Sequence, residues 1–576
     1  MDKTEMKNLI DTAMKRKKAD VVIKNCSLVN VFTGEINKTD IALCGKYIAA
    51  TGSYDGKEEI DAEGKFACPG FIDSHIHVES SCVSPEEMGR MLIPHGTTTI
   101  IADPHEIVNV CGLKGLEYMM KAAEGTALEI KYMLPSCVPA TPFENSGAVI
   151  DAGMMSATLK NPDILGLGEM MNFPGVINAD DAVIEKIAEA QKAGKVIDGH
   201  APSLIGEGLC AYAAAGILAD HECSTVEEMN ERIANGMYVM LREGSACHNL
   251  RTLLKGVTPF NSQRCLLCSD DRQSSTIIDE GHLDNHLSIC VKEGIEPVEA
   301  VRMATLNAAM CFGFKDKGAI APGRKADIVL LDDLKNFNAR YVFKDGELVA
   351  KDGQYLPPVT HFDISDVRSS VNVKDFSGEK LKMHLKSSRV NTIEIIPGSI
   401  VTKKSAEEIK VDENGEFIFD ENKDIVKISV IERHHGLGNV ANGFLKGYGL
   451  KKGAVAVSVA HDSHNIIAAG ASDEEIEFAV KKLIEQEGGI TVVLENKLLS
   501  SLPFPIAGLM SDKDCRYVDE KIKEIHKTAV EILGVNRDID PVMTLCFMSL
   551  PVIPEIKITD MGLFDVNKFS FIKTEA

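Results

Sequence analysis

The sequence lacks long apolar runs and any excess of positive charge. No stretch of about 18 uninterrupted apolar residues occurs. The first twenty residues, MDKTEMKNLIDTAMKRKKAD, are charged throughout and contain no apolar segment typical of a secretory signal. The 62 lysines and arginines are outnumbered by 85 aspartates and glutamates, which gives a net charge of −23 and a surface that repels a phosphate backbone. We expect a cytoplasmic protein that binds neither membrane nor nucleic acid.

A disulfide framework is also missing. The 15 cysteines are scattered along the chain without regular spacing. Because the sequence has no export signal and disulfides are rare in the cytoplasm, we expect reduced and mostly buried thiols.

The length predicts several domains, because single hydrophobic cores stop growing near about 250 to 300 residues and this chain has 576. Residues 1–68 and 318–365 share short β-rich runs separated by turn residues, so we expect them to form one discontinuous β-sandwich domain. Residues 69–317 would be inserted between these two stretches. Residues 366–576 have a different pattern and are expected to form a C-terminal α+β domain.

The inserted segment repeats one pattern eight times: a short apolar run ends in a polar residue, and a helical segment follows. Ser84, Pro85 and Glu87 predict one helix start with a capping box, and Gly194 predicts the end of another helix. Eight strand–helix units in about 250 residues match the size of a (β/α)8 TIM barrel. The runs are FIDSHIH (71–77), TTTIIAD (97–103), EIKYMLP (129–135), DILGLGE (163–169), KVIDGH (195–200), GILADH (216–221), GMYVML (236–241) and CLLCSD (265–270).

The ends of these runs are rich in side chains that bind metals. The carboxyl ends of parallel strands meet at one edge of a barrel, where the chemistry of this fold takes place. His75 and His77 lie two residues apart on one run, so both project from the same face. Catalytic zinc typically takes about three protein ligands, so a larger set predicts two ions. The expected ligands are His75, His77, Glu169, His200, His221 and Asp270.

Several motifs resemble a known family. PGFIDSHIHVESS, the eight-run layout and GAIAPGRKADIVLL resemble the amidohydrolase superfamily. A closer resemblance, to the bacterial and archaeal adenine deaminases, covers nearly the whole chain. Its motifs are FIDSHIHVESS, GTTTIIADPHEIVNV, GLGEMMNFPGVI, GHAP, DHECST, LCSDDR and, in the C-terminal domain, ERHHGLGNVANGFLKGYGLKKGAVAVSVAHDSHN.

The resemblance implies two divalent ions, manganese or iron, with zinc as a further candidate. The first histidine pair and Asp270 would hold one ion, the histidines at positions 200 and 221 the other, and Glu169 would bridge both. This nitrogen and oxygen ligand set suits hard or borderline divalent ions. The implied reaction is the hydrolytic deamination of adenine to hypoxanthine and ammonia in purine salvage. We expect a small-molecule purine substrate and a homo-oligomer, with a dimer as the default.

The expected proton transfers involve carboxylates near the ions. Asp270 would accept the proton of the attacking water. Single-metal deaminases of the superfamily carry a glutamate in a His-x-Gly-Glu pattern, whereas His200 is followed here by Ala201, Pro202 and Ser203. Glu222 is therefore the candidate proton shuttle, with Glu106 behind it, and either residue could instead orient a metal ligand.

Residues after the second run are expected at the pocket. His105 and Glu106 are assigned to substrate contact or to support of the metal ligands. Asp271, beside Asp270, is interpreted as similar support or as a helix cap.

Two other functions compete with deamination. A cyclic amide hydrolase of the dihydroorotase or hydantoinase type shares the His-x-His pair, but those enzymes bridge their ions with a modified lysine where this chain has Glu169. A non-catalytic scaffold would typically lose metal ligands, and all six candidates are present.

Two motifs of the C-terminal domain are not assigned to function. The histidines of HDSHN, His461 and His464, and the pair His434 and His435 lack a clear carboxylate or cysteine set nearby in the sequence, so we expect them at an interface with the barrel and not in a second metal site. The glycine-rich GLGNVANGFLKGYG does not have the spacing of a phosphate-binding loop.

Overall fold

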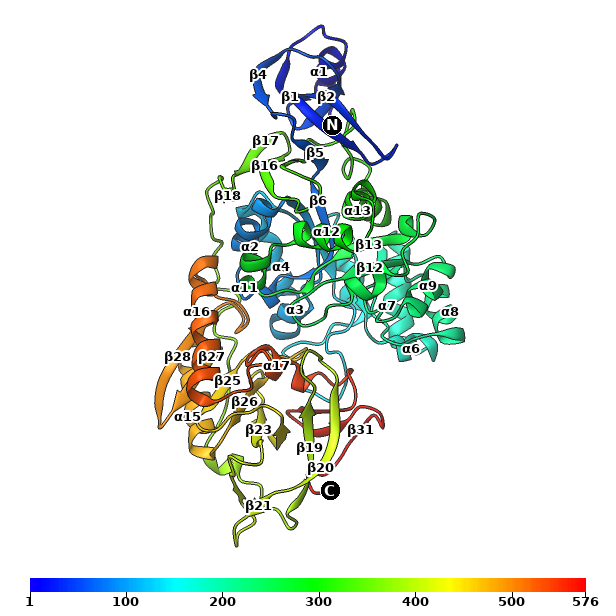
Figure 1. The fold of residues 1–576 in the computed structure, drawn as a ribbon. Coiled ribbons are helices and arrows are strands. Elements are labelled where there is room, and N and C mark those ends of the chain that lie inside the picture. The colour runs from blue at the N-terminus through cyan, green and yellow to red at the C-terminus, as the bar shows by residue number, and fades with distance from the viewer.

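The sheet at the N-terminal end of the molecule combines two distant stretches of the chain. The computed structural model describes residues 1–576, and this nine-stranded sheet runs β18-β17-β16-β15-β5-β1-β2-β3, with β4 paired to β1 (Figure 1). Strand β5 pairs with β1 on one side and with β15 on the other, which joins the two stretches directly. The strands are β1 Ala19–Asn30, β2 Glu35–Cys44, β3 Tyr47–Thr51, β4 Gly56–Asp61, β5 Phe66–Pro69, β15 Ile328–Leu331, β16 Ala339–Lys344, β17 Glu347–Lys351 and β18 Gln354–Tyr355. Helix α1 (Lys3–Ala13) packs against β2 and β3.

All eight runs expected to be strands are strands in the structure. They form a six-stranded parallel sheet, β10-β9-β8-β7-β6-β14, and a three-stranded parallel sheet, β11-β12-β13. The two sheets are linked, because β13 leads directly into β14 and the Leu218 backbone N–H donates to the Ile197 carbonyl across 2.9 Å beside β10. Together they make a curled parallel sheet. Its strands are β6 Phe71–His77, β7 Thr97–Ala102, β8 Glu129–Leu134, β9 Ile164–Met170, β10 Val196–Gly199, β11 Ala219–Asp220, β12 Tyr238–Arg242, β13 Cys265–Cys268 and β14 Asp270–Asp271.

Helices alternate with these strands and cover the outside of the curled sheet (Figure 1). The α-helices are α2 Pro85–Leu92, α3 His105–Cys111, α4 Leu113–Ala122, α5 Ala152–Thr158, α6 Phe173–Ile177, α7 Asp181–Lys192, α8 Gly206–Ala214, α9 Val226–Ala234, α10 Leu250–Leu254, α11 Ser274–Glu280, α12 Leu283–Lys292, α13 Pro297–Met303 and α14 Leu306–Cys311. Short 3-10 turns are η1 Glu79–Ser81, η2 Ile93–His95, η3 Ala123–Gly125 and η4 Ser262–Arg264.

One helix boundary agrees with the sequence prediction and another agrees only in part. Gly194 follows the end of α7 with a φ of 68°, a conformation that glycine adopts without steric cost. Helix α2 does begin at Pro85 after Ser84, but the predicted capping box is wrong, because the Ser84 side chain makes no capping hydrogen bond. Glu87 instead accepts hydrogen bonds from the Cys515 backbone at 3.0 Å and from His361 at 2.9 Å. Tertiary contacts with later segments have replaced the local interaction.

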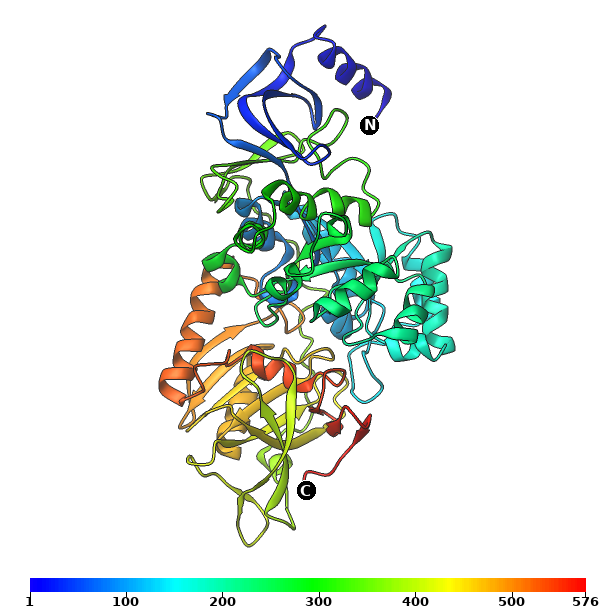
Figure 2. The same cartoon turned by 45° about the vertical axis from the view of Figure 1, so that its right-hand side comes forward.

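The C-terminal part is built on an eight-stranded sheet in the order β20-β19-β24-β23-β26-β25-β27-β28. Figure 2 shows this part, coloured from yellow-green to red, below the curled sheet. Helix α15 (Asp473–Glu485) packs against the central strands of this sheet, and α16 (Cys515–Thr528) contacts β28 together with α2 and α11 of the curled-sheet region. The strands are β19 Arg389–Ile395, β20 Thr402–Glu408, β21 Lys410–Val411, β22 Phe417–Ile418, β23 Ile425–Ile431, β24 Val440–Lys446, β25 Ala454–Val457, β26 Ile466–Gly470, β27 Gly489–Leu494, β28 Lys497–Pro503, β29 Ile556–Thr559, β30 Gly562–Asp565 and β31 Ser570–Phe571. The remaining helical segments are η5 Gly378–Leu381, the π-helix Ala529–Leu533, α17 Met543–Cys546 and η7 Phe547–Ser549.

The apolar core is continuous between the curled sheet and the C-terminal sheet. One buried cluster includes Leu241 on β12 and Ile107 on α3 from the curled-sheet region, and Val457 on β25 and Leu545 on α17 from the C-terminal part. All 15 cysteines are free, including Cys265 and Cys268, which form a Cys-x-x-Cys sequence inside β13. None of the helices combines the length and the apolar character needed to cross a lipid bilayer.

Candidate metal centre

The six expected ligands come together at the carboxyl ends of the curled-sheet strands. His75 and His77 lie on β6 and Glu169 lies on β9. The histidines at positions 200 and 221 directly follow β10 and β11, and Asp270 begins β14. All six side chains are buried.

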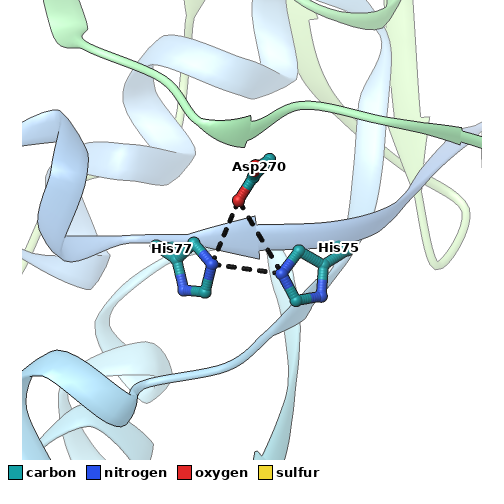
Figure 3. Close-up of side chains that lie close together, drawn as sticks. All are labelled: His75, His77 and Asp270. Carbon is teal, nitrogen blue, oxygen red and sulfur yellow. Dashed lines mark hydrogen bonds and ion pairs between the residues drawn. The ribbon is translucent and has the colours of Figure 1, made fainter. Parts of the chain in front are cut away.

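The first three ligands face one another closely. The Nε2 atoms of His75 and His77 are 3.1 Å apart, and the Oδ1 atom of Asp270 lies 3.1 Å from the His77 nitrogen and 3.9 Å from the His75 nitrogen. Figure 3 shows one nitrogen of each ring directed toward the other ring's nitrogen and toward the Asp270 carboxylate.

The partners of these two rings indicate that their Nε2 lone pairs converge. The Nδ1 of His75 lies 3.0 Å from the Asp198 carboxylate, and the Nδ1 of His77 lies 2.9 Å from the Asp103 carbonyl oxygen. Both partners only accept hydrogen bonds, so each Nδ1 carries the proton in a neutral ring and each Nε2 presents a lone pair. Two lone pairs and a carboxylate oxygen directed at one point repel one another unless a cation lies between them. This arrangement therefore fits a bound metal ion, and the Asp198 carboxylate is the kind of partner that orients a metal-bound histidine.

Glu169 lies between the two pairs of histidines. Its Oε1 is 3.5 Å from the Nε2 of His77, whereas its Oε2 is 2.7 Å from the Nδ1 of His200 and 3.2 Å from the Nε2 of His221. One carboxylate oxygen thus faces each pair. The other ring nitrogens of the second pair, His200 Nε2 and His221 Nδ1, are buried without a hydrogen-bond partner.

The electric field of the centre keeps its carboxylates ionised. Burial raises the pKa of Glu169, but the surrounding histidines, His200 first, hold that pKa well below its ordinary value. Burial likewise raises the pKa of Asp270, while Arg242 and then His77 hold it well below the usual range. Buried carboxylates that stay ionised are suitable ligands for divalent cations.

The remaining candidate residues line one pocket together with five of the six expected ligands, all except His75. His105 and Glu106 begin α3, and the Nδ1 of His105 lies 3.1 Å from Glu169. Glu222 follows His221, with its Oε1 3.8 Å from the Nδ1 of His200 and 3.7 Å from the Nε2 of His221. Asp271 accepts a hydrogen bond of 2.5 Å from the hydroxyl of Ser80 and does not cap a helix.

The C-terminal part forms the opposite wall of the pocket. The residues that it contributes are Ile400, His461, Asp462, Phe547, Leu550, Val552 and Ile553. The Oδ1 of Asp462 lies 3.7 Å from the Nε2 of His105, and the His461 ring stacks on Phe547 with 4.5 Å between the ring centres. Elsewhere along this contact, the Nε2 of His435 donates to the Ser146 carbonyl at 2.8 Å. These histidines meet the curled-sheet region, whereas His434 bonds to Ser463 within the C-terminal part.

Comparison with known proteins identifies the family. The profile described as "Amidohydrolase family" matches residues 66–349, and the one described as "Adenine deaminase C-terminal domain" matches residues 399–570. The chain is 59% identical, over 100% of both sequences, to a protein named adenine deaminase 2 from Desulfotalea psychrophila. The chain belongs to the adenine deaminase family of amidohydrolases. It is also 50% identical, again over 100% of both sequences, to an adenine deaminase of Ligilactobacillus salivarius. The resemblance expected from the motifs is confirmed.

Arg242 is a residue of this deaminase-family site that the sequence analysis missed. Its Nη1 lies 2.7 Å from the Oδ2 of Asp270 and contacts the Oε1 of Glu222, and its Nη2 is 3.2 Å from the Oε2 of Glu222. The seventh run was taken to end at Leu241, but β12 extends to Arg242. Extending that run by one residue would have revealed a charged strand end like the others.

Replacing Arg242 with glutamine is expected to reduce kcat at pH 7 by about 10- to 100-fold, as is typical for loss of a group that supports a metal ligand. Burial raises the pKa of both Asp270 and Glu222, and the charge of Arg242 is the largest of the effects that lower these pKa values. Without it both pKa values rise, so the acid limb of the pH–rate profile should move to higher pH. Arg251→Gln, at an exposed arginine of α10, is the matched control. An unchanged acid limb in Arg242→Gln would contradict this role.

Lys557 on β29 holds two segments of the pocket wall. Its ammonium donates to the Ile400 carbonyl at 2.8 Å and to the Phe547 carbonyl at 3.0 Å, and it has no carboxylate partner. Burial lowers the pKa of Lys557 to about 7. One fully buried amine thus links the pocket-lining segments that carry Ile400 and Phe547.

The buried Lys557 makes stability depend on pH. Because its folded pKa lies below the unfolded value of about 10.4, the unfolded chain binds the extra proton between these values, so stability rises with pH across this window. Relative to Lys557→Met, the free energy of unfolding of the wild type should increase by about 1.4 kcal/mol per pH unit between pH 8 and 9. The urea midpoints of both proteins at each pH measure this difference. The difference in the free energy of unfolding between the wild type and Lys452→Met, at an exposed lysine, should not change with pH.

Proposed function

We propose that this enzyme hydrolyses adenine to hypoxanthine and ammonia in purine salvage. The observation that carries the proposal is the assembly of six buried metal-binding side chains, five of them lining one pocket, in a chain that matches adenine deaminases over its full length. A bridging position occupied by Glu169, where the cyclic amide hydrolases use a lysine, favours the deaminase reaction.

The proposed centre holds two divalent ions, manganese or iron, with zinc as a further candidate. His75, His77 and Asp270 would hold one ion, the histidines at positions 200 and 221 the other, and Glu169 would bridge both. The position of one Glu169 oxygen toward each pair supports this division. When bound, such ions lower the pKa of a water molecule and orient it toward C6 of the purine.

Asp270 is the proposed general base. Its Oδ1 faces the first histidine pair, and its Oδ2 is held by Arg242. The ion pair fixes the carboxylate orientation and keeps it ionised, so Asp270 can accept the proton of the attacking water.

Glu222 is the proposed proton shuttle. Burial raises its pKa, but Arg242 keeps the pKa below the ordinary value. Glu222 is therefore an acceptor in the resting enzyme and becomes a donor to the purine ring or the departing amine only after it has taken up a proton. If it does not carry a proton, its distance of less than 4 Å from both nearby histidines suits it to orient them. His105, directed at Glu169 and Asp462, is proposed to contact the substrate or to support the bridge.

The surrounding architecture is proposed to be a closed (β/α)8 barrel of residues 69–317. It would be inserted in a β-sandwich domain of residues 1–68 and 318–365 and followed by an α+β domain of residues 366–576. The pairing of β15 with β5 and the hydrogen bond between Leu218 and Ile197 support this division. A cytoplasmic homodimer is the proposed working form.

Loss of adenine absorbance together with release of ammonia tests the proposed reaction. Metal-loaded protein should convert adenine, and it should leave a dihydropyrimidine unchanged. Hydrolysis of the dihydropyrimidine without turnover of adenine would instead identify a cyclic amide hydrolase.

A further inference from the structure

Three buried side chains from different parts of the chain meet beside the catalytic pocket. Glu106 comes from the first turn of α3, whereas His461 and His464 lie on the segment between β25 and β26. One ligand atom of each residue lies within 4.8 Å of the other two. The Nδ1 of His461 is 3.5 Å from the Oε1 of Glu106.

Polar atoms of this cluster have no partner. His464 is 0% exposed, and neither of its ring nitrogens makes a hydrogen bond. The Oε2 of Glu106 is also buried without a partner. Buried polar groups are nearly always satisfied, so unpartnered atoms on two of the three residues indicate that a bound group belongs there.

The charge around the cluster favours a cation. Glu79 and Asp271 lie close by, since the Ser80 hydroxyl contacts Glu106 at 3.2 Å and Asp271 at 2.5 Å, and Glu79 accepts from the backbone of α3. No lysine or arginine forms an ion pair with the carboxylates of Glu79, Glu106 or Asp271, and the ion-pair partner of Glu106 is His461. The guanidinium of Arg433 donates to the backbone carbonyls of Ser370, Ser458, His464 and Ala507 and to the Ser370 hydroxyl, and not to a side chain of the cluster.

We propose that Glu106, His461 and His464 bind a third divalent cation, separate from the six-ligand centre. Ligand atoms about 2.1 Å from an ion are at most about 4.2 Å apart, so the observed cluster needs only a small inward movement. Two imidazoles and one carboxylate suit Fe²⁺, Mn²⁺ or Zn²⁺. The ion would tie the segment that carries His461 and Asp462 to α3 and hold it over the pocket. Glu106 would then act through the ion and not by direct contact with the purine.

Metal analysis and anomalous diffraction of the full chain, loaded with Mn²⁺ and freed of excess ion, test this site. The wild type should contain three ions per chain, with an anomalous peak at the manganese edge among the three side chains. His464→Gln should contain two ions and lack that peak, whereas His384→Gln, at an exposed histidine of the C-terminal part, should retain three.

The wild-type map alone decides the question if His464→Gln fails to fold. Two ions per chain with no peak at this cluster would overturn the proposal, and so would an unchanged third peak in folded His464→Gln. Adenine turnover is measured on the same samples. A three-ion protein that does not deaminate adenine would contradict the proposed function and leave the cation site standing.

Discussion

Asp270→Asn is expected to lower kcat for adenine about 1,000-fold, within the range that general base catalysis contributes. The amide is nearly isosteric with the carboxylate, so its oxygen can still face His77, now 3.1 Å from the carboxylate oxygen. It cannot take up a proton near neutral pH, and it also loses the charge that attracts Arg242. Steady-state rates of adenine loss for the metal-loaded variant measure the effect.

Asp279→Asn is the matched control for this substitution. Asp279 lies on α11 near Asp270 in sequence, but its side chain is 56% exposed and pairs with Lys523 on the surface. Its turnover should stay near that of the wild type. Near-normal activity in Asp270→Asn, with the circular dichroism spectrum of the wild type, would exclude Asp270 as the base.

Glu169→Gln is expected to lose at least one bound ion per chain and more than 100-fold in activity. The carboxylate is the negative group that faces both histidine pairs. A neutral amide at this position leaves one pair without an anionic ligand, and even loss of outer supporting groups costs about 10- to 100-fold in metal affinity or activity. Ion content after gel filtration and kcat of the same sample measure both effects.

The stabilising effect of metal gives a second measurement on Glu169→Gln. Ions that bind only the folded state raise its stability, so added Mn²⁺ should raise the melting temperature of the wild type more than that of the variant. Glu185→Gln, at an exposed glutamate of α7, should behave as the wild type does. Equal ion content in Glu169→Gln and the wild type would rule out the bridging role.

The catalytic pocket combines two distant parts of the chain. The curled-sheet region supplies five of the six candidate ligands, and the C-terminal part supplies the wall with His461, Asp462 and Phe547. The sequence predicted an interface between histidines of the C-terminal part and the barrel, and the structure adds that His461 lines the pocket at this interface. The C-terminal part closes the pocket opposite the metal centre and places Asp462 next to His105.

Periodic features could be predicted because they depend on near neighbours in sequence. Each of the eight apolar runs is a strand, and the polar residue at the end of a run is brought to the carboxyl edge by the parallel arrangement of the strands. The position of Gly194 after α7 is similarly local. Where a side chain had a choice between local and distant partners, as Glu87 did at the start of α2, the prediction was wrong.

Residues whose partners lie on other segments of the pocket could not be predicted from patterns of near neighbours in sequence. The contact of Arg242 with both Glu222 and Asp270 joins the seventh strand to those on either side of it. His461 and His464 were set aside because no carboxylate lies near them in sequence, whereas Glu106, from α3, lies beside them in space. Such contacts depend on how separate segments of the chain pack, and the spacing of two residues in sequence does not give the distance between their side chains in the fold.

The sequence by itself therefore determined the strand pattern, the six candidate ligands at the strand ends and the resemblance to adenine deaminases, because short-range periodicity and motifs are sufficient for these. Only the tertiary structure decided that the candidate ligands lie together and buried, that Arg242 links two carboxylates of the pocket, and that the C-terminal part forms the opposite wall. The physical reason is that burial, ion pairing and the convergence of lone pairs are properties of the distances between atoms, and those distances exist only after the chain has packed.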